Sequence, residues 1–447
     1  MAERSRRLSA RSVIRLLSEE FSPFPDRGDR PHAPDGPLAW PGYDASRARA
    51  AERTGEDESV VCGTALIEGT RAVLVVCEFG FLGGSLGERT GDRLESAYAH
   101  ARERRLPVVA LVATGGSRMQ EGMVALTQLQ RVARESALTR AAGVPQIAVL
   151  RDPATGGGWA TLGTGADVVL ALPGAQVGFA GSRVRPADAD PAAYTAEAQV
   201  AAGAADAVVT PEALRGTLGQ WLRLLTSSPT TEPAPPPRPL GLTDPPATGW
   251  DAVHRARHPD RPRASRYLDA YFTHRVTVSG DRCGGTDPTG ILCGFGESRH
   301  DGRTVAYAAQ TGTATRPAGY RTAARLIRLA DRLGVPVLTL VDTPGAANDA
   351  EAERQGVGPA IADVFAAVAT ARTPVTTLVI GEGGSGGALA LAAPGHTYAA
   401  PDSYFSVIAP ELAAAILKRG PEDTEVTANQ LKITPRDLVR LGLVRPL

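Results

Sequence analysis

The sequence predicts an α/β protein made of two tandem domains that share one fold. Two short patterns, each a strand followed by a glycine-rich turn, occur twice in the 447 residues: 106–116 returns as 335–345, and 144–157 returns as 373–387. The offset is 229 residues from position 107 to 336 and from 145 to 374, and 230 from 156 to 386. A chain of this length also exceeds what one hydrophobic core usually serves. The repeat therefore predicts two similar domains with two similar sites.

The first domain is expected over 36–228, after an N-terminal extension at 1–35 that carries one amphipathic helix around 13–17. Apolar runs bounded by turn residues predict strands at 73–76, 107–113 and 146–150. Between them lie a helix through 97–105 and a long helix from about 119. Met123, Leu126, Leu129 and Val132 recur every three residues and give that long helix an apolar face.

A proline-rich segment at 229–249 is interpreted as an extended, semi-rigid linker. The second domain is expected over 250–447, with the same order of elements. Strands are predicted at 304–309, 336–341 and 375–380, and a helix at 318–333, whose Ala323, Leu326, Ile327 and Ala330 form an apolar face. Alternation of strands and helices in both halves predicts α/β layering.

Composition excludes several classes of function. Charged residues make up 21% of the chain and the net charge is zero, which argues against binding nucleic acid through bulk charge. The four cysteines show no paired spacing, so neither a zinc site nor any other bound metal is expected. The sequence lacks a run of about 20 apolar residues and an apolar signal region, so we expect no membrane partner and a cytoplasmic protein.

Glycine pairs stand in the turns at 83–84, 115–116, 156–158 and 383–387, between strands and helices. Glycines in such turns often serve only close packing and positive φ. In matched pairs, however, they leave backbone N–H groups at helix starts free to bind a negative oxygen. None is followed by the Lys-Ser/Thr of a phosphate-binding loop, and the lone Gly-x-Gly-x-x-Gly at 381–386 is a weak indication of dinucleotide binding. The turns favour oxyanion binding by backbone donors.

Several stretches resemble a known enzyme family. Residues 36–185 are similar to the β subunit of bacterial acetyl-CoA carboxylase carboxyltransferase, and 260–420 to the α subunit. The most specific strings are Gly-Gly-Ser-Arg-Met-Gln-Glu-Gly at 115–122 and Gly-Glu-Gly-Gly-Ser-Gly-Gly-Ala at 381–388; Asp-Thr-Pro-Gly-Ala at 342–346 supports them. The chain therefore resembles a fused β/α carboxyltransferase subunit, and the resemblance implies two tandem crotonase-like domains.

The resemblance implies transfer of a carboxyl group from carboxybiotin to a short acyl-CoA, with acetyl-CoA to malonyl-CoA as the default. Gly116 and Gly157 would stabilise the thioester oxygen, and Gly345, Gly387 and Ala388 the oxygen of biotin. The binding residues would also include the remaining turn glycines, Gly84, Gly115, Gly156 and Gly386. The chain shows no Met-Lys-Met biotin site, so we expect a separate biotin carboxyl carrier protein and a separate biotin carboxylase. A homo-oligomer, dimer or hexamer, with sites between subunits is also implied.

Two alternatives remain open at this stage. A decarboxylase of the malonate decarboxylase type would use the same scaffold and the same oxyanion-binding turns. A catalytically altered scaffold subunit is the other alternative, because 317–322 and 347–349 depart from the α-subunit pattern. A third departure is Trp159, which is expected beside the oxyanion turn of the first domain, where small residues are usual in the family. Together, these departures leave the identity of the acyl substrate open.

Overall fold

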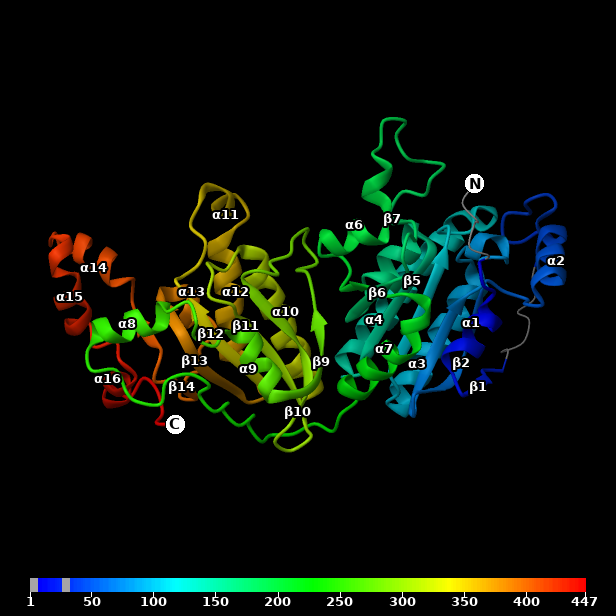
Figure 1. The fold of residues 1–447 in the computed structure, drawn as a ribbon. Coiled ribbons are helices and arrows are strands. Elements are labelled where there is room, and N and C mark those ends of the chain that lie inside the picture. Colours follow the sequence, from blue (N-terminus) through cyan, green and yellow to red (C-terminus); the bar gives the residue numbers. More distant parts are fainter. Residues whose placement is uncertain (1–6, 26–32) are drawn as a thin grey trace. The chain divides into compact units, whose positions relative to one another are not determined.

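The computed structural model describes residues 7–25 and 33–447 (Figure 1). The backbone packs into two units, Met1–Thr226 and Ser227–Leu447. Each unit has its own sheet, with helices in the connections between parallel strands (Figure 1). The α/β layering predicted from the sequence is confirmed in both halves.

The sheet of the first unit has an antiparallel edge and a parallel centre. Its strands, in spatial order, are β1 (Glu20–Pro23), β2 (Val60–Ile67), β3 (Thr70–Cys77), β4 (Val108–Thr114), β5 (Gln146–Thr155), β6 (Val168–Ala171) and β8 (Ala207–Val208), with β7 (Val177–Gly178) pairing the end of β5. From β3 to β8 the strands run parallel. All seven residues of β4 are buried, as expected for a strand covered on both faces.

Helices connect the parallel strands of the first unit. α3 (Glu88–Arg104) joins β3 to β4, and α4 (Gly122–Ala141) joins β4 to β5; the two pack side by side. The remaining helices are α1 (Ala10–Leu17), α2 (Tyr43–Thr54), the short α5 (Gly156–Gly158), α6 (Ala196–Ala201) and α7 (Pro211–Leu225). The segment before residue 36 thus supplies α1 and the edge strand β1 to this unit.

The apolar face predicted for α4 is not the side of the helix that is buried. Met123 and Leu126 are 66% and 46% exposed, whereas Val132 is buried. A helix turns 100° per residue, so positions spaced strictly by three drift around it instead of following one face. The buried side of α4 follows three- and four-residue steps, and its residues are Ala125, Gln128, Val132, Glu135, Ser136 and Thr139.

The second unit repeats this architecture. Its strands, in spatial order, are β14 (Thr397–Ala399), β13 (Val375–Gly384), β12 (Val337–Thr343), β11 (Thr304–Gln310), β10 (Ile291–Ser298) and β9 (Phe272–Val278), with β15 (Tyr404–Ser406) pairing the end of β13. β11 to β14 are parallel. α10 (Pro317–Leu333) and α12 (Val357–Thr370) occupy the places of α3 and α4. The predicted apolar face of α10 is confirmed, since its four residues are fully buried.

Shorter helices complete the second unit: α8 (Gly249–Arg257), α9 (Ala264–Tyr271), α11 (Ala350–Arg354), α13 (Ser385–Leu389), α14 (Pro410–Ile416), α15 (Thr424–Gln430) and α16 (Pro435–Arg440). The proline-rich segment packs on this unit. Thr230 N–H donates to the Gly334 carbonyl, and the Thr376 hydroxyl donates to the carbonyl of the fully buried Ala234. Boundaries at 36, 229 and 250 stay predictions; the backbone packing divides the chain after Thr226.

Candidate active site

The turn after β4 presents a backbone donor toward the end of β5. Gly116 has φ +110°, and its N–H donates to the Thr114 hydroxyl at 3.0 Å. Leu86 N–H donates to the Gly116 carbonyl, and Arg118 N–H donates to the Leu86 carbonyl, both at 2.9 Å. In such a parallel bridge the intervening residue, Ser117, turns its own N–H to the opposite side. Within the described residues that N–H has no hydrogen-bond acceptor.

The second donor of the first unit lies at the helix start after β5. Gly156 has φ +65° and donates to the Phe179 carbonyl at 3.1 Å. The following N–H, that of Gly157, has no acceptor in the described part of the chain, as expected in the first turn of a helix. A Cβ on Gly156 would lie 3.0 Å from the Cα of Gly116. The two glycine turns therefore touch.

The second unit reproduces this arrangement. Gly345 has φ +142°, and its N–H donates to the Thr343 hydroxyl at 3.1 Å. Thr315 and Ala346 form the same isolated bridge, so the N–H of Ala346 is placed as that of Ser117 is. Thr114, Gly116 and Ser117 correspond to Thr343, Gly345 and Ala346 at a constant offset of 229 positions.

The same offset holds at the second turn. Ser385 has φ +61°, which matches Gly156, and the strand registers Thr114–Ala154 and Thr343–Gly383 agree with it. The offset of 230 that pairs Gly156 with Gly386 in the sequence was wrong: Gly156 corresponds to Ser385. The sequence offset was counted between glycine pairs. The structure instead matches residues that have the same backbone conformation, whether or not both are glycines.

Gly387 occupies a crowded position of the second turn. A Cβ there would lie 2.5 Å from both the backbone N of Ala346 and the Tyr320 hydroxyl. Gly386 and Gly387 stand in the first turn of α13, and their N–H groups have no acceptor among the residues described. Ala388 follows as the fourth residue of the helix. The contact brings the N–H of Ala346 and the start of α13 together.

A buried ion pair holds the first turn in place. Arg118 is 1% exposed and donates to the fully buried Glu58 carboxylate and, at 2.8 Å, to the Ser85 carbonyl. It also reaches the Tyr43 hydroxyl and Glu121. Burial opposes ionisation of Glu58, but the Arg118 guanidinium outweighs it and lowers the pKa of Glu58 to about 2. Glu58 is thus held as a carboxylate.

A different ion pair holds the second turn. Asp342, immediately before the turn, is fully buried and accepts from Arg261, which is itself buried. Arg261 also donates to the Ile380 carbonyl at 3.2 Å, and Glu382 N–H donates to Asp342 at 3.2 Å. The pair therefore ties the end of β12 to the end of β13. It has no sequence counterpart in the first unit, where the arginine follows the turn.

The structure gathers the predicted residues into one cluster in each unit. The first holds Gly84, Gly115, Gly116, Gly156 and Gly157, and the second holds Gly345, Gly386, Gly387 and Ala388. Gly84 and Gly115 serve packing, because the Gly115 N–H donates to the Gly83 carbonyl and a Cβ on Gly84 would lie 2.2 Å from the Ala113 carbonyl.

Sequence reasoning missed Ser117 and Ala346. Both lie inside the family motifs, Ser117 in 115–122 and Ala346 in 342–346, and each follows a predicted glycine. The two ion pairs were also missed, because their partners lie far apart in the sequence and carry no local signal.

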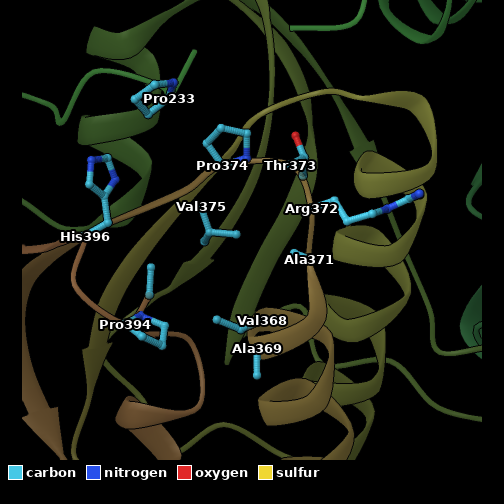
Figure 2. A pocket seen from close by; sticks show the side chains of 11 residues that line it. Pro233, Val368, Ala369, Ala371, Arg372, Thr373, Pro374, Val375, Pro394 and His396 are labelled. Atoms are coloured by element: carbon cyan, nitrogen blue, oxygen red, sulfur yellow. The ribbon is translucent and has the colours of Figure 1, made fainter. Parts of the chain in front are cut away.

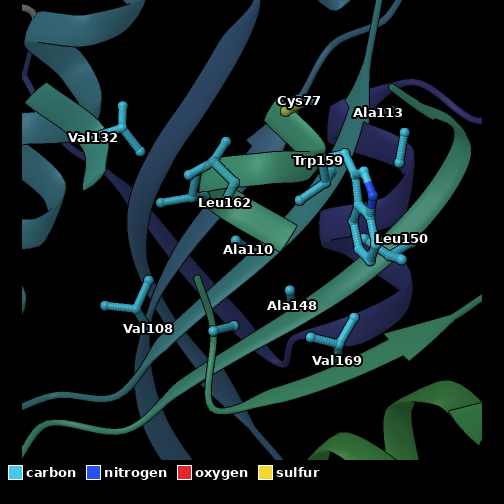
Figure 3. Close-up of a cluster of buried hydrophobic side chains, with 14 of the residues drawn as sticks. Cys77, Val108, Ala110, Ala113, Val132, Ala148, Leu150, Trp159, Leu162 and Val169 are labelled. Atoms are coloured by element: carbon cyan, nitrogen blue, oxygen red, sulfur yellow. The ribbon is translucent and has the colours of Figure 1, made fainter. Parts of the chain in front are cut away.

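Trp159 does not project into the site. It is 7% exposed and belongs to the hydrophobic core of the first unit, with its ring beside Leu150 (Figure 3). A π-helical turn, Trp159–Gly163, accommodates it, and Gly163 leaves room for the ring: a Cβ there would lie 2.4 Å away. The expected position of Trp159 beside the glycine turn is correct for its backbone and wrong for its side chain.

A shallow cavity in the second unit lies away from these turns. Its volume is about 400 Å³, and it opens where β13 begins, between Pro233, Arg372, Pro374 and His396 (Figure 2). None of the predicted site residues lines it. It therefore gives no support to the site.

Residues 7–25 and 33–447 contain no helix with the length and apolar content needed to cross a bilayer. The same residues contain no group of three or more His, Cys, Asp and Glu side chains placed to share a metal ion.

Two family models match the chain. Residues 41–210 match the carboxyl transferase domain, and residues 246–446 match the acetyl co-enzyme A carboxylase carboxyltransferase-like family. The chain is 39% identical over 425 residues to the acetyl-coenzyme A carboxylase carboxyl transferase subunits beta/alpha of Saccharopolyspora erythraea, covering 90% of this chain and 73% of that protein. It is 36% identical over 439 residues to a probable biotin-dependent acyl-coenzyme A carboxylase beta3 subunit of Mycobacterium tuberculosis, covering 94% and 86%.

Solved structures show the same fold. The transcarboxylase 12S hexamer core superposes with a TM-score of 0.79 at 22% identity, covering 98% of this chain and 86% of that one. A single-chain, multi-domain long-chain acyl-CoA carboxylase superposes with a TM-score of 0.75 at 20% identity, covering 99% and 44%. The two tandem crotonase-like domains implied by the sequence are thus confirmed. The chain belongs to the biotin-dependent acyl-CoA carboxyltransferases and is a fused beta/alpha carboxyltransferase subunit of the acetyl-CoA carboxylase type.

Proposed function

We propose that this protein transfers a carboxyl group from carboxybiotin, carried by a separate protein, to a short acyl-CoA, with acetyl-CoA as acceptor and malonyl-CoA as product. The observation that supports this is the duplicated pair of turns, each with backbone N–H groups that lack acceptors within the described residues. The reaction has two carbonyl oxygens that gain negative charge, one in each substrate. Two similar oxyanion sites therefore match its needs.

The first unit would serve the thioester. In this assignment the N–H groups of Ser117 and Gly157 hold the thioester oxygen as the enolate forms, and Gly116 shapes the turn between them. Backbone donors suit this task because the fold fixes them before the reaction begins, so they cost no reorganisation. Loss of one such donor lowers the rate on the order of 10²- to 10³-fold in comparable sites.

The second unit would serve biotin. Its candidate donors are the N–H groups of Ala346, Gly386 and Gly387, with Ala388 and Gly345 completing the predicted set. When biotin is bound, its ureido group supplies the carboxylate and then accepts the α-proton of the acyl-CoA. The residues of this chain need only hold the ureido oxygen, which agrees with the absence of any titratable side chain among the predicted site residues.

The partners follow from the same chemistry. The only lysines, Lys418 and Lys432, stand in Leu-Lys-Arg and Leu-Lys-Ile, and neither is flanked by methionines. This supports delivery of biotin on a separate carrier charged by a separate biotin carboxylase. We also propose a homo-oligomer in which the first unit of one subunit meets the second unit of another, and a cytoplasmic location.

A decarboxylase remains the second candidate, because it would use the same oxyanion turns. The other alternative, a catalytically altered scaffold subunit, has less support than a decarboxylase. It was based on the altered segments 317–322 and 347–349. Asp349, in one of them, caps α11 by accepting from the N–H groups of Glu351 and Ala352 and pairs with Arg316. This departure thus has a structural use at the start of a helix.

The test supplies the purified protein with a carboxylated biotin carrier and a panel of acyl-CoAs. Transfer predicts a carboxylated acyl-CoA that appears only when the carrier is present. A decarboxylase instead releases CO₂ from malonyl-CoA without any biotin. If neither product forms with any acyl-CoA, the proposal is refuted.

A further inference from the structure

Two buried side chains converge on one backbone carbonyl of the second turn. Gln310 Nε2 and the Tyr320 hydroxyl both donate to the Gly387 carbonyl, each at 3.1 Å. Gln310 ends β11, Tyr320 lies in the first turn of α10, and neither side chain is exposed. Two side-chain donors from different elements thus fix one peptide of α13.

Gln310 also connects the other half of the turn. Its Nε2 donates to the Thr315 hydroxyl at 3.2 Å. The backbone of Thr315 in turn donates to the Gly345 carbonyl at 3.3 Å and accepts from Ala347 N–H at 2.9 Å. One amide group is therefore bonded directly to the start of α13 and, through Thr315, is connected to the turn around Ala346.

These hydrogen bonds restrict a part of the second turn that glycine would otherwise leave flexible. Gly386 and Gly387 have no Cβ, so their backbone is the least restricted of any residue type. Donors that stabilise an oxyanion must be fixed before the charge develops. Bonds to the Gly387 carbonyl restrict the rotation of that residue and so hold the direction of the neighbouring N–H groups.

The unpaired oxygen of Gln310 points to the same role. Gln310 Oε1 is buried without a hydrogen-bond partner among the described residues. An apolar side chain of similar size would avoid the cost of burying that oxygen. What the glutamine supplies to this site is therefore its pair of N–H groups.

The first unit lacks such a pair of side-chain hydrogen-bond donors. The strand registers match Gln310, the last residue of β11, with Cys77, the last residue of β3, and the offset of 229 matches Tyr320 with Gly91; neither position carries an amide or hydroxyl side chain. The effect of the two residues should therefore be confined to the second unit.

We infer that Gln310 and Tyr320 are positioning residues that hold the biotin-side oxyanion donors of the second unit through the Gly387 carbonyl. The inference rests on the proposed function for the identity of the bound oxygen. The geometric part, that the two side chains order the start of α13, does not depend on it.

The experiment is a double-mutant cycle of Gln310→Met and Tyr320→Phe, with Tyr307→Phe as matched control. Tyr307 is equally buried in β11 and donates to the Val276 carbonyl at 3.3 Å, outside the site. Transfer is measured from malonyl-CoA to free biocytin, and amide hydrogen exchange is followed at Gly386–Leu389. Thermal unfolding verifies that each variant is folded.

Each single variant should lower kcat about 3- to 10-fold, because the other donor still holds the carbonyl. The double variant should lose about as much as the removal of one oxyanion donor, on the order of 10²-fold in kcat, which is at least the product of the two single losses. KM for malonyl-CoA should not change, since the first unit binds it. Exchange at α13 should rise in the double variant and remain at the wild-type rate in Tyr307→Phe.

The inference is overturned if α13 exchanges at the wild-type rate in the folded double variant. It is also overturned if kcat of that variant stays within about twofold of an active wild type, or if only KM for malonyl-CoA changes. A wild type that transfers nothing refutes the proposed function, and the exchange measurement still decides whether the two residues order the turn.

Discussion

Replacing Gly387 by alanine tests the geometry of the second turn with one added methyl group. The new Cβ would stand 2.5 Å from the backbone N of Ala346 and from the Tyr320 hydroxyl. This is roughly 1 Å short of ordinary van der Waals contact. The hydroxyl can yield, but Ala346 N belongs to the backbone of the opposite half of the site. The two halves must therefore separate by a large part of that distance.

The size of the effect follows from this displacement. A misplacement of about 1 Å at reacting groups costs on the order of 10²-fold in rate. Overpacking of a buried site costs about 1–3 kcal/mol of stability. We therefore expect Gly387→Ala to fold with a lowered melting temperature and to transfer carboxyl groups about 100-fold more slowly. Its KM for the acyl-CoA should stay near the wild-type value.

Gly358→Ala is the matched control. Gly358 lies near the start of α12 in the same unit, has no positive φ, and a Cβ there would meet nothing within 4 Å. Alanine at a helical position of this kind stabilises by about 0.4–1 kcal/mol. Both variants are assayed with the carboxylated carrier and acetyl-CoA, and unfolded in urea. Wild-type kcat in Gly387→Ala would refute the reasoning, as would an equal loss in Gly358→Ala.

Four further outcomes are expected. Arg118→Met should lower the free energy of unfolding in urea by about 3–5 kcal/mol, because it leaves Glu58 charged and buried; a loss under about 1 kcal/mol would contradict the pair's role. Glu58 has a folded-state pKa near 2 against an ordinary 4.5, so its contribution to stability is present above about pH 4.5 and disappears as the pH falls toward 2. Glu58→Gln should flatten acid unfolding in that window, and an unchanged profile would count against it. Gly157→Ala should be milder than the substitution in the second turn, because the three atoms nearest to its Cβ all belong to the Leu129 side chain, the first at 2.3 Å, and not to the backbone. Leu129→Ala should restore its kcat, and failure to do so would locate the conflict elsewhere. Trp159→Phe should lower the melting temperature yet keep the order of preference among acyl-CoAs, and a changed order would show that the side chain reaches the substrate.

The sequence predicted the repeated architecture because strands and turns carry local signals. The apolar run before Thr114 and the glycines after it predict a buried strand and a turn from adjacent residues alone. The face of α4 was mispredicted because three-residue spacing does not follow one side of a helix. The support of the turns was not predictable, since Glu58 and Arg118 lie 60 positions apart and meet only in the fold.

The contrast between the two ion pairs explains why the repeat is visible only near the turns. The arrangement of the N–H donors after Thr114 and after Thr343 depends on backbone conformation. It recurs at the constant offset of 229 residues. Each turn is also held by a buried charge pair beside it, and either end of the pair can adjoin the turn: Arg118 follows it in the first unit and Asp342 precedes it in the second. Side chains that hold the backbone indirectly therefore differ between the two units, whereas the backbone conformation of the turns is kept even where Ser385 stands in place of Gly156. On this reasoning, differences between the two substrates are encoded in what surrounds the duplicated turns, while the turns themselves supply the same backbone chemistry twice.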